Sequence, residues 1–320
     1  MILPRIRLAV LPTPIEALPS LSAYLGGPQI LVKRDDLTGL GMGGNKVRKL
    51  EFLIAEAKAN GAKMLITTGA AQSNHCRQTA AAAARMGYAC HLVLTRNEEG
   101  SSGGNLLLDS LFGAEITWCD KADREKVLAE VFDSEWNSGK RPYLIPYGGS
   151  NPSGASAYAN AFSELVSQGI SPDVIIFPTS SGGTQAGLVL GAKMHNSKIR
   201  ILGISVDEEA ETLKAKVSKL ANAAAERMQI LEVVETNEIL VDDNYIGQGY
   251  GILSGLEREA IKLFARKEGL LLDPVYTGRA AGAMIDLIQK GNLKAGQQVL
   301  FWHTGGTPAL FASQYESALL

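Results

Sequence analysis

Short apolar segments alternate with helical patterns through most of this chain. In the first half, segments with many aliphatic residues occupy 30–32, 63–68, 90–95, 115–118 and 143–146. In the second half, similar segments occupy 174–178, 199–206, 270–272 and 298–303. Strands that alternate with helices form parallel sheets whose faces are covered by those helices. The pattern therefore predicts an α/β fold.

The length of 320 residues allows two domains with separate cores. The four apolar segments between residues 63 and 146 suit a small α/β domain, and a Gly/Ser/Asn/Pro cluster at 148–154 is a suitable return point to a second one. We expect each domain to be an open, mostly parallel sheet flanked by helices. The expected small domain is 51–154, and the expected large domain combines 1–50 and 155–320.

Composition excludes several classes of function. A net charge of -2 and a pI of about 6.1 argue against binding to nucleic acid or to a membrane surface. No apolar run is long enough for a membrane span, and the first residues lack the apolar region of a signal peptide, so we expect a cytoplasmic protein. The three scattered cysteines suit reduced thiols. None of the four histidines has a partner at metal-ligand spacing, so we expect no metal.

A glycine-rich turn at residues 39–44 runs directly into a helix that carries two lysines near its start. Glycine lets a backbone pass close to a flat ligand, because no Cβ stands in the way. Lys46 and Lys49 are three residues apart and share a helix face, so one amine can bond to an aldehyde while the other neutralises a phosphate. A basic, solvated helix start is the alternative. The periodicity assigns a separate, core-facing side to Val47, Leu50, Ile54 and Ala57.

The same turn matches a dinucleotide-binding fingerprint through Gly39, Gly41 and Gly44. A nucleotide-binding unit of this kind ends its second strand with an acidic residue for the ribose hydroxyls. The strand expected at 63–69 ends without a carboxylate. A nicotinamide-dependent oxidoreductase is therefore kept as a minority alternative.

Two further segments are typical of anion sites at helix starts. Ser73 is placed to cap a helix that begins after the turn 69–75, where free N–H groups can bind a substrate carboxylate, although Ser73 alone is also an ordinary cap. The segment 179–184 combines small hydroxyl residues with two glycines before a helix, which suits one compact phosphate monoester better than a triphosphate; an ordinary loop is the less favoured alternative. The charged run 33–36 is either a solvated strand end or an ion-pair cluster that braces the site.

The chain resembles the fold-type II, tryptophan synthase β-like enzymes that use pyridoxal phosphate. It is most similar to the group of D-cysteine desulfhydrases and 1-aminocyclopropane-1-carboxylate (ACC) deaminases. The resemblance extends through nearly the whole chain, in the motifs LPTPIE (11–16), KRDDLTGL (33–40), GGNKVRKLEF (43–52), GAAQSNHCRQ (69–78), TSSGGTQAG (179–187), DPVYTG (273–278) and HTGG (303–306). It implies two domains with the cofactor in the cleft between them, a small amino-acid substrate and a homodimer.

The resemblance also implies roles for single residues. Lys46 matches the lysine that bonds to the cofactor, and Lys49 is the expected charge partner of its phosphate. Asn74 matches the asparagine beside the ring hydroxyl of the cofactor. The phosphate loop corresponds to Ser180, Ser181, Gly182, Gly183 and Thr184. The substrate is expected to contact Ser73, Asn74, His75, Tyr250 and Tyr276.

Two positions, occupied by threonine in this chain, separate the ACC deaminases from the other members of this group. ACC deaminases typically have a glutamate after the second tyrosine and a leucine before the final Gly-Gly, where this chain has Thr277 and Thr304. A carboxylate beside the pyridine nitrogen makes the ring a strong electron sink, as cyclopropane opening requires, whereas a hydroxyl suffices when the β-carbon carries a good leaving group. The substitutions therefore favour β-elimination.

The prediction is conversion of D-cysteine to pyruvate, hydrogen sulfide and ammonia. Lys46 or Ser73 is expected to remove the α-proton, and Tyr276 to assist the leaving group. An L-cysteate sulfo-lyase and an ACC deaminase are alternatives of the same class. Outside that class, the alternatives are the nicotinamide enzyme and a non-catalytic binding protein.

Overall fold

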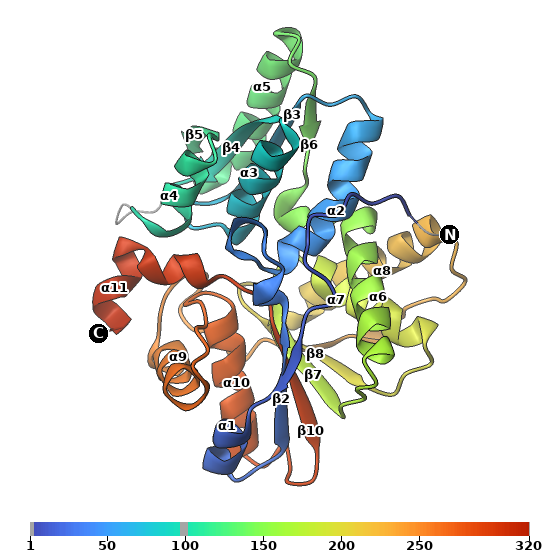
Figure 1. The fold of residues 1–320 in the computed structure, drawn as a ribbon, viewed down its shortest axis with the longest axis vertical. Helices are drawn as coiled ribbons and strands as arrows, with labels where there is room; N and C mark the ends of the chain where they lie inside the picture. Colours follow the sequence, from blue (N-terminus) through green and yellow to red (C-terminus); the bar gives the residue numbers. More distant parts are fainter. Residues whose placement is uncertain (1–2, 97–101, 320) are drawn as a thin grey trace.

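The computed structural model describes residues 3–96 and 102–319, which build two sheets, one above the other in Figure 1. The larger sheet has six strands, in the order β1 (Ile15–Ala17), β2 (Gln29–Arg34), β10 (Gln298–His303), β7 (Val174–Thr179), β8 (Arg200–Ser205) and β9 (Leu240–Asp242). β1 runs antiparallel to β2, and the other pairs in this sheet are parallel.

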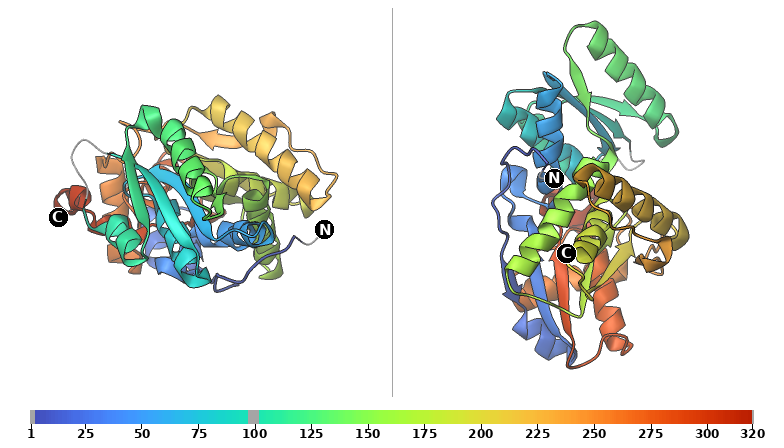
Figure 2. Two further views of the ribbon diagram at one scale, coloured as in Figure 1. Left: turned by 90° about the horizontal axis from the view of Figure 1, so that it is seen from above. Right: turned by 90° about the vertical axis from the view of Figure 1, so that its right-hand side faces the viewer.

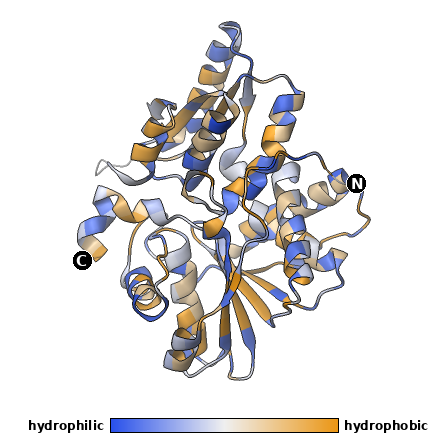
Figure 3. Ribbon diagram, in the orientation of Figure 1, coloured by the Kyte–Doolittle hydropathy of each residue, from blue (hydrophilic) through white to orange (hydrophobic). Residues whose placement is uncertain are grey.

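Helices cover both faces of the larger sheet because its central strands are apolar on both sides (Figures 2 and 3). Along β10, Leu300 and Trp302 belong to the core on one face, and Val299 and Phe301 to the core on the other. The first core is covered by α6 (Pro152–Ser167), α7 (Gly183–Met194) and α8 (Ala210–Met228). The second is covered by α1 (Pro19–Leu25), α9 (Gly255–Glu268) and α10 (Thr277–Gln289).

The smaller sheet is parallel, in the order β5 (Glu115–Cys119), β4 (Ala89–Thr95), β3 (Met64–Ala70) and β6 (Pro142–Leu144). One face packs against α2 (Asn45–Ala59), α3 (Asn74–Met86) and α4 (Gly104–Leu111). The other face packs against α5 (Arg124–Asn137). Short 3₁₀ segments occupy Asp35–Leu37, Leu40–Met42, Lys121–Asp123, Tyr147–Gly149, Thr236–Glu238 and Thr307–Phe311, and α11 (Ser313–Leu319) follows the last of these.

The prediction of an α/β fold with two mostly parallel sheets is confirmed. The strand expected at 270–272 is wrong: this segment has no strand partner, and the main-chain oxygen of Leu271 lies 3.1 Å from the His303 ring nitrogen Nε2. The expected domain boundary at residue 50 falls inside α2, whose Val47 and Leu50 pack in the core of the smaller sheet. The division into 1–50, 51–154 and 155–320 stays a prediction.

The charged run 33–36 forms a buried ion-pair cluster and is not a solvated strand end. Asp35 is fully buried and pairs with Arg48, and Lys33 is fully buried and pairs with Glu164 on α6. Arg48 also contacts Glu164, at 2.9 Å, so the cluster joins β2, α2 and α6. The cluster therefore fixes α2, the helix that carries Lys46, against the larger sheet.

Within the described residues, none of the helices combines the length and the apolar character that a bilayer crossing needs.

Candidate active site

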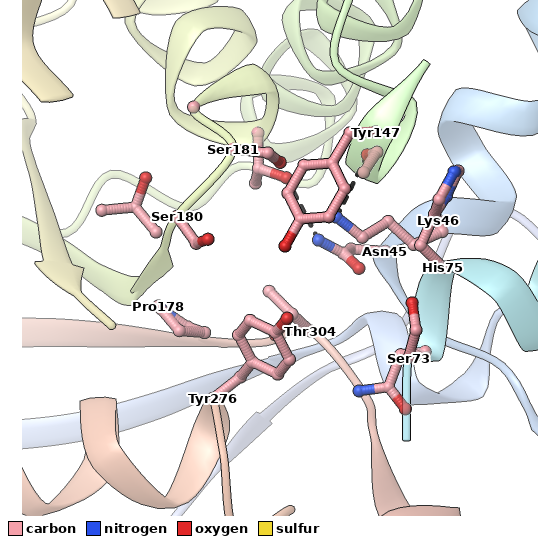
Figure 4. A pocket seen from close by; sticks show the side chains of 15 residues that line it. Asn45, Lys46, Ser73, His75, Tyr147, Pro178, Ser180, Ser181, Tyr276 and Thr304 are labelled. Carbon is pink, nitrogen blue, oxygen red and sulfur yellow. Dashed lines mark hydrogen bonds between the residues drawn. The ribbon is translucent and has the colours of Figure 1, made fainter. Parts of the chain in front are cut away.

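A pocket lies where segments from both sheets meet (Figure 4). It is lined by residues 45–46 at the start of α2, 73–75 at the start of α3, 147–148, 178–182, Thr184, Tyr276 and Thr304. Thr179 is the last residue of β7 and Thr304 follows the last residue of β10, so both lie at the carboxyl ends of strands, where ligands bind in open α/β sheets. The site is therefore built from the edge of the larger sheet and from helix starts that face it.

The amines of Lys46 and Lys49 converge at this site, as their spacing predicts. Their Nζ atoms lie 3.1 and 3.2 Å from the same main-chain oxygen, that of Gly148. Burial lowers the pKa of Lys46 to about 8, against an opposing hydrogen bond with Lys49. Burial, and then the charge of Lys46, hold the pKa of Lys49 well below its ordinary value. No carboxylate pairs with either amine in the described part of the chain, so the site favours an anion.

In the protein without a bound ligand, we expect the Lys46 amine to react with aldehydes at a rate that rises with pH and levels off above about 8. Only the neutral amine carries the lone pair that attacks a carbonyl. For an ordinary lysine the rise would continue to about 10.4. The rate of absorbance change after mixing with an aromatic aldehyde, measured over a pH series, tests this, with Lys46→Met as the background. A rise that follows the ordinary lysine value would contradict it.

The loop after β7 forms a compact anion cradle. Gly182 has a φ of +79°, and α7 begins at Gly183, so the first N–H groups of this helix face the loop. A Cβ at Gly183 would lie 2.5 Å from Ser150 Oγ and 2.9 Å from Lys49 Nζ, so a side chain there would displace these two groups. Ser150 Oγ also lies 2.8 Å from Ser181 Oγ and 3.2 Å from Lys49 Nζ. Hydroxyls, an amine and a helix N-terminus around one small space suit a phosphate group.

Ser180 and Thr184 lie in the same loop but have partners of their own. The Ser180 hydroxyl donates to Asp207 Oδ2 at 2.9 Å, so its proton is directed away from a phosphate in this arrangement. Thr184 Oγ1 accepts a hydrogen bond from Asn45 Nδ2 at 3.1 Å. Residues 180–182 and Thr184 of the expected phosphate loop thus line the pocket next to Ser150, and their role in binding a phosphate stays a prediction.

The turn at 73–75 combines a cap with pocket-lining side chains. Ser73 Oγ accepts from the main-chain N–H of Cys76 at 3.2 Å, as the N-cap of α3. His75 Nε2 lies 2.9 Å from Thr67 Oγ1, whose proton goes to the main-chain oxygen of Ile145, so Nε2 is the donor. Burial, and then the nearby lysines, hold the pKa of His75 well below its usual value. His75 is therefore neutral and held in one tautomer.

Of the predicted tyrosines and threonines, Tyr276 and Thr304 line the pocket. Tyr250 lies behind Tyr276, with the two hydroxyls 2.7 Å apart and the rings edge to face. Thr277 is fully buried; its hydroxyl donates to Asp273 Oδ1 at 2.6 Å and accepts from the main-chain N–H of Asp273. Thr304 is thus part of the pocket wall. Thr277 does not line the pocket, and its hydroxyl is hydrogen-bonded to the carboxylate of Asp273.

Several lining residues were not predicted: Asn45, Tyr147, Gly148 and Pro178. Tyr147 has the guanidinium of Arg124 over its ring, 4.8 Å from the centroid, and burial raises the pKa of its hydroxyl to about 12. Gly148 belongs to the stretch 148–154 that the sequence suggested as a return between domains, and Tyr147 directly precedes this stretch. In the sequence, the glycine pair 148–149 was the available signal for this part of the site. The structure shows its reason, because the main-chain oxygen of Gly148 lies beside the amines of Lys46 and Lys49.

One cluster outside the pocket bears on the expectation of no metal. The cluster brings possible ligand atoms from three elements within 4.8 Å of one another, those of His91, Glu115 and Glu135. These residues are far apart in the sequence, so their spacing along the chain did not predict the cluster. His91 Nδ1 lies 3.1 Å from Glu135 Oε1, and the other oxygen of Glu135 pairs with Lys140 at 2.8 Å. The cluster is therefore already paired internally, and the absence of a metal stays a prediction.

A family model described as "Pyridoxal-phosphate dependent enzyme" matches residues 6–305 of this chain. The chain belongs to this family. The site fits pyridoxal phosphate, because Lys46 is placed to bond to its aldehyde and Lys49 with the 181–184 cradle would be placed to hold its phosphate. The cofactor predicted from the sequence is thus pyridoxal phosphate, and the nicotinamide alternative is wrong.

Several solved structures are similar to this chain. A crystal structure described as an ACC deaminase homologue is 39% identical to this pyridoxal-phosphate enzyme, with a TM-score of 0.91, and covers 99% of this chain and 95% of that one. A hydrogen sulfide-producing enzyme from Fusobacterium nucleatum is 18% identical, with a TM-score of 0.66, covering 92% of this chain and 96% of that one. A pyridoxal-phosphate-dependent aspartate racemase is 19% identical, with a TM-score of 0.66, covering 92% and 90%. The last two show the fold alone.

Proposed function

We propose that this pyridoxal-phosphate enzyme catalyses β-elimination on D-cysteine, forming pyruvate, hydrogen sulfide and ammonia with one water consumed. The observation that carries the proposal is the polar wall of the pocket. Thr304 presents a hydroxyl there, and no Asp or Glu is among the described residues that line the pocket. A wall without a carboxylate suits elimination of a good leaving group better than opening of a cyclopropane ring.

Each step has a candidate group in this chain. When bound, pyridoxal phosphate withdraws electrons from the α-carbon of the attached amino acid. The helix start at Ser73 offers N–H groups for the substrate carboxylate, and Lys46, with its lowered pKa, is suited to take the α-proton. Tyr276, hydrogen-bonded to Tyr250, is suited to donate a proton to the leaving sulfur. Burial raises the pKa of both tyrosines, which keeps them protonated as acids.

A specific observation favours one second candidate, ACC deamination. The structure that is 39% identical to this chain is described as an ACC deaminase homologue. Asp273 also lies directly behind Thr277, so a carboxylate is close to the wall although it does not line the pocket. L-cysteate sulfo-lyase activity is a third candidate, since it uses the same elimination with sulfite as leaving group. A homodimer and a cytoplasmic location stay predictions.

The test is an absorption spectrum of the purified protein with pyridoxal phosphate, before and after D-cysteine, L-cysteine, L-cysteate and ACC. We expect the cofactor band to change with D-cysteine, and equal amounts of sulfide and pyruvate to appear. Ammonia and 2-oxobutanoate from ACC alone would favour the second candidate, and sulfite with pyruvate from L-cysteate alone the third. A spectrum that responds to none of the four would overturn the whole class.

A further inference from the structure

Asn105 lies behind the pocket, in the first turn of α4, and contacts Asn74 from that side. It is fully buried. Its Nδ2 lies 3.0 Å from Asn74 Oδ1 and 2.8 Å from the main-chain oxygen of Gln72. Its main-chain N–H donates to Gln72 Oε1 at 2.8 Å. Of these residues, Asn74 lines the pocket, so Asn105 reaches the site through it.

Two glycines bring Asn105 into this position. Gly103 and Gly104 both have a positive φ, at +69° and +53°. A Cβ at Gly104 would lie 2.5 Å from Gln72 Oε1 and 3.0 Å from the main-chain oxygen of Pro308. The start of α4 therefore approaches the turn before α3 more closely than a residue with a side chain would allow.

These contacts determine which way both amides are turned. A main-chain carbonyl only accepts hydrogen bonds, so the atom of Asn105 that faces Gln72 must be the NH₂ group. The same NH₂ group faces Asn74, so the Asn74 atom at that contact must be the oxygen. The nitrogen of Asn74 is then the end of the amide that remains for a ligand.

We propose that Asn105 is a positioning residue for the cofactor: it holds the amide of Asn74 so that the nitrogen donates to the ring oxygen of pyridoxal phosphate. The inference rests on the role proposed for Asn74 beside the ring hydroxyl. A donor at that place stabilises the ionised form of the hydroxyl. An asparagine amide rotates easily about its last torsion, so without Asn105 the oxygen of Asn74 would face the cofactor part of the time and repel it.

The variant Asn105→Asp tests the proposal with little change of shape. Its carboxylate places an oxygen against the main-chain oxygen of Gln72 and against Asn74 Oδ1, which removes the donor that fixes Asn74. We expect about tenfold weaker binding of pyridoxal phosphate to the apoprotein, the effect of one lost hydrogen bond. The pH at which the absorption band of the bound cofactor changes should also rise. Asp109→Asn, one turn later on the same helix and equally buried, is the control and should bind as the wild type does.

A double-mutant cycle with Asn74→Ala separates positioning from general damage. If Asn105 acts through Asn74, the Asn105→Asp change weakens binding in the wild-type background and adds nothing once Asn74 is alanine. Effects that add in full would overturn the proposal, and so would an Asn74→Ala variant with normal affinity and spectrum. Asn105→Ala repeats the cycle without the added carboxylate. These binding measurements need no turnover, so they stand apart from the substrate assays that test the proposed reaction.

Discussion

Replacing Lys46 with alanine is expected to leave a folded protein that turns over no substrate. Lys46 is the pocket-lining amine at the end of the glycine turn, and its lowered pKa leaves much of it neutral near pH 8. It is proposed both to bond to the cofactor and to move the α-proton. The loss of one positioned proton-transfer group alone costs about 10²–10⁴-fold in rate. Lys49 and the 181–184 cradle remain, so we expect the variant still to bind the cofactor without a covalent bond.

Two measurements check this expectation. Borohydride treatment followed by mass spectrometry should attach the cofactor to the peptide of Lys46 in the wild type, and to no peptide in the variant. Turnover of each candidate substrate should fall to background. The control is Lys58→Ala, which removes an exposed lysine from the same helix and should change neither result. Cofactor attached at another lysine, or turnover retained in Lys46→Ala, would contradict the assignment of Lys46.

Replacing Asp35 with asparagine is expected to cost about 3–5 kcal/mol of the free energy of unfolding, because it removes the buried carboxylate of an ion pair and leaves Arg48 with Glu164 alone as its charged partner. The Asp35 carboxylate is fully buried and accepts hydrogen bonds from four side chains. These donors come from the lead-in, α2, α6 and β10: Thr13 (2.9 Å), Arg48 (2.8 and 3.0 Å), Tyr158 (2.6 Å) and Trp302 (2.8 Å). An asparagine amide would lose the charge and turn an NH₂ group towards some of these donors.

Urea unfolding of the variant and the wild type measures this loss. Glu16→Gln is the matched control: it removes a carboxylate whose partner Arg34 lies at 2.7 Å, but Glu16 is 43% exposed. An exposed ion pair of this kind is worth about 0–1 kcal/mol. Equal losses in the two variants would show that the buried cluster contributes no more than a surface pair.

The pH dependence of stability gives an independent check on Asp35. Burial acts to raise its pKa, but Arg48 and the hydrogen bonds from Tyr158 and Trp302 outweigh burial and hold the pKa below the ordinary value. A carboxyl group whose folded pKa is depressed contributes stability above its unfolded pKa, about 3.9, and loses it as the pH falls further. The wild type should therefore lose more stability than Asp35→Asn as the pH falls below about 4.

Local patterns predicted the parts of the site that depend on one segment. The 3.6-residue period placed Val47 and Leu50 in the core, and so placed Lys46 and Lys49 on the other side of α2. The capping rule placed Ser73 at the start of α3. These features are decided within a few residues, so their neighbours along the chain are sufficient to reveal them.

Contacts between side chains that are far apart in the chain could not be predicted from the sequence. Ser180 donates to Asp207, which the next strand brings beside it. His91 meets two glutamates only because β4, β5 and α5 are neighbours. In each case the side-chain type was visible in the sequence, but its direction was set by tertiary packing.

The pair of amines on α2 has a consequence for the proposed binding of the cofactor, because both amines can exchange protons with the solvent. Before a ligand arrives, burial disfavours a positive charge on both Lys46 and Lys49, and the charge of Lys46 adds to this effect at Lys49. With the roles proposed for these residues, a phosphate dianion beside Lys49 would favour the charged amine, so Lys49 would take up a proton as the phosphate enters. Lys46 attacks an aldehyde only as the neutral amine, so a charged Lys46 would first release one proton, and the condensation itself would release water. Cofactor loading would then depend on pH through two amines of one helix.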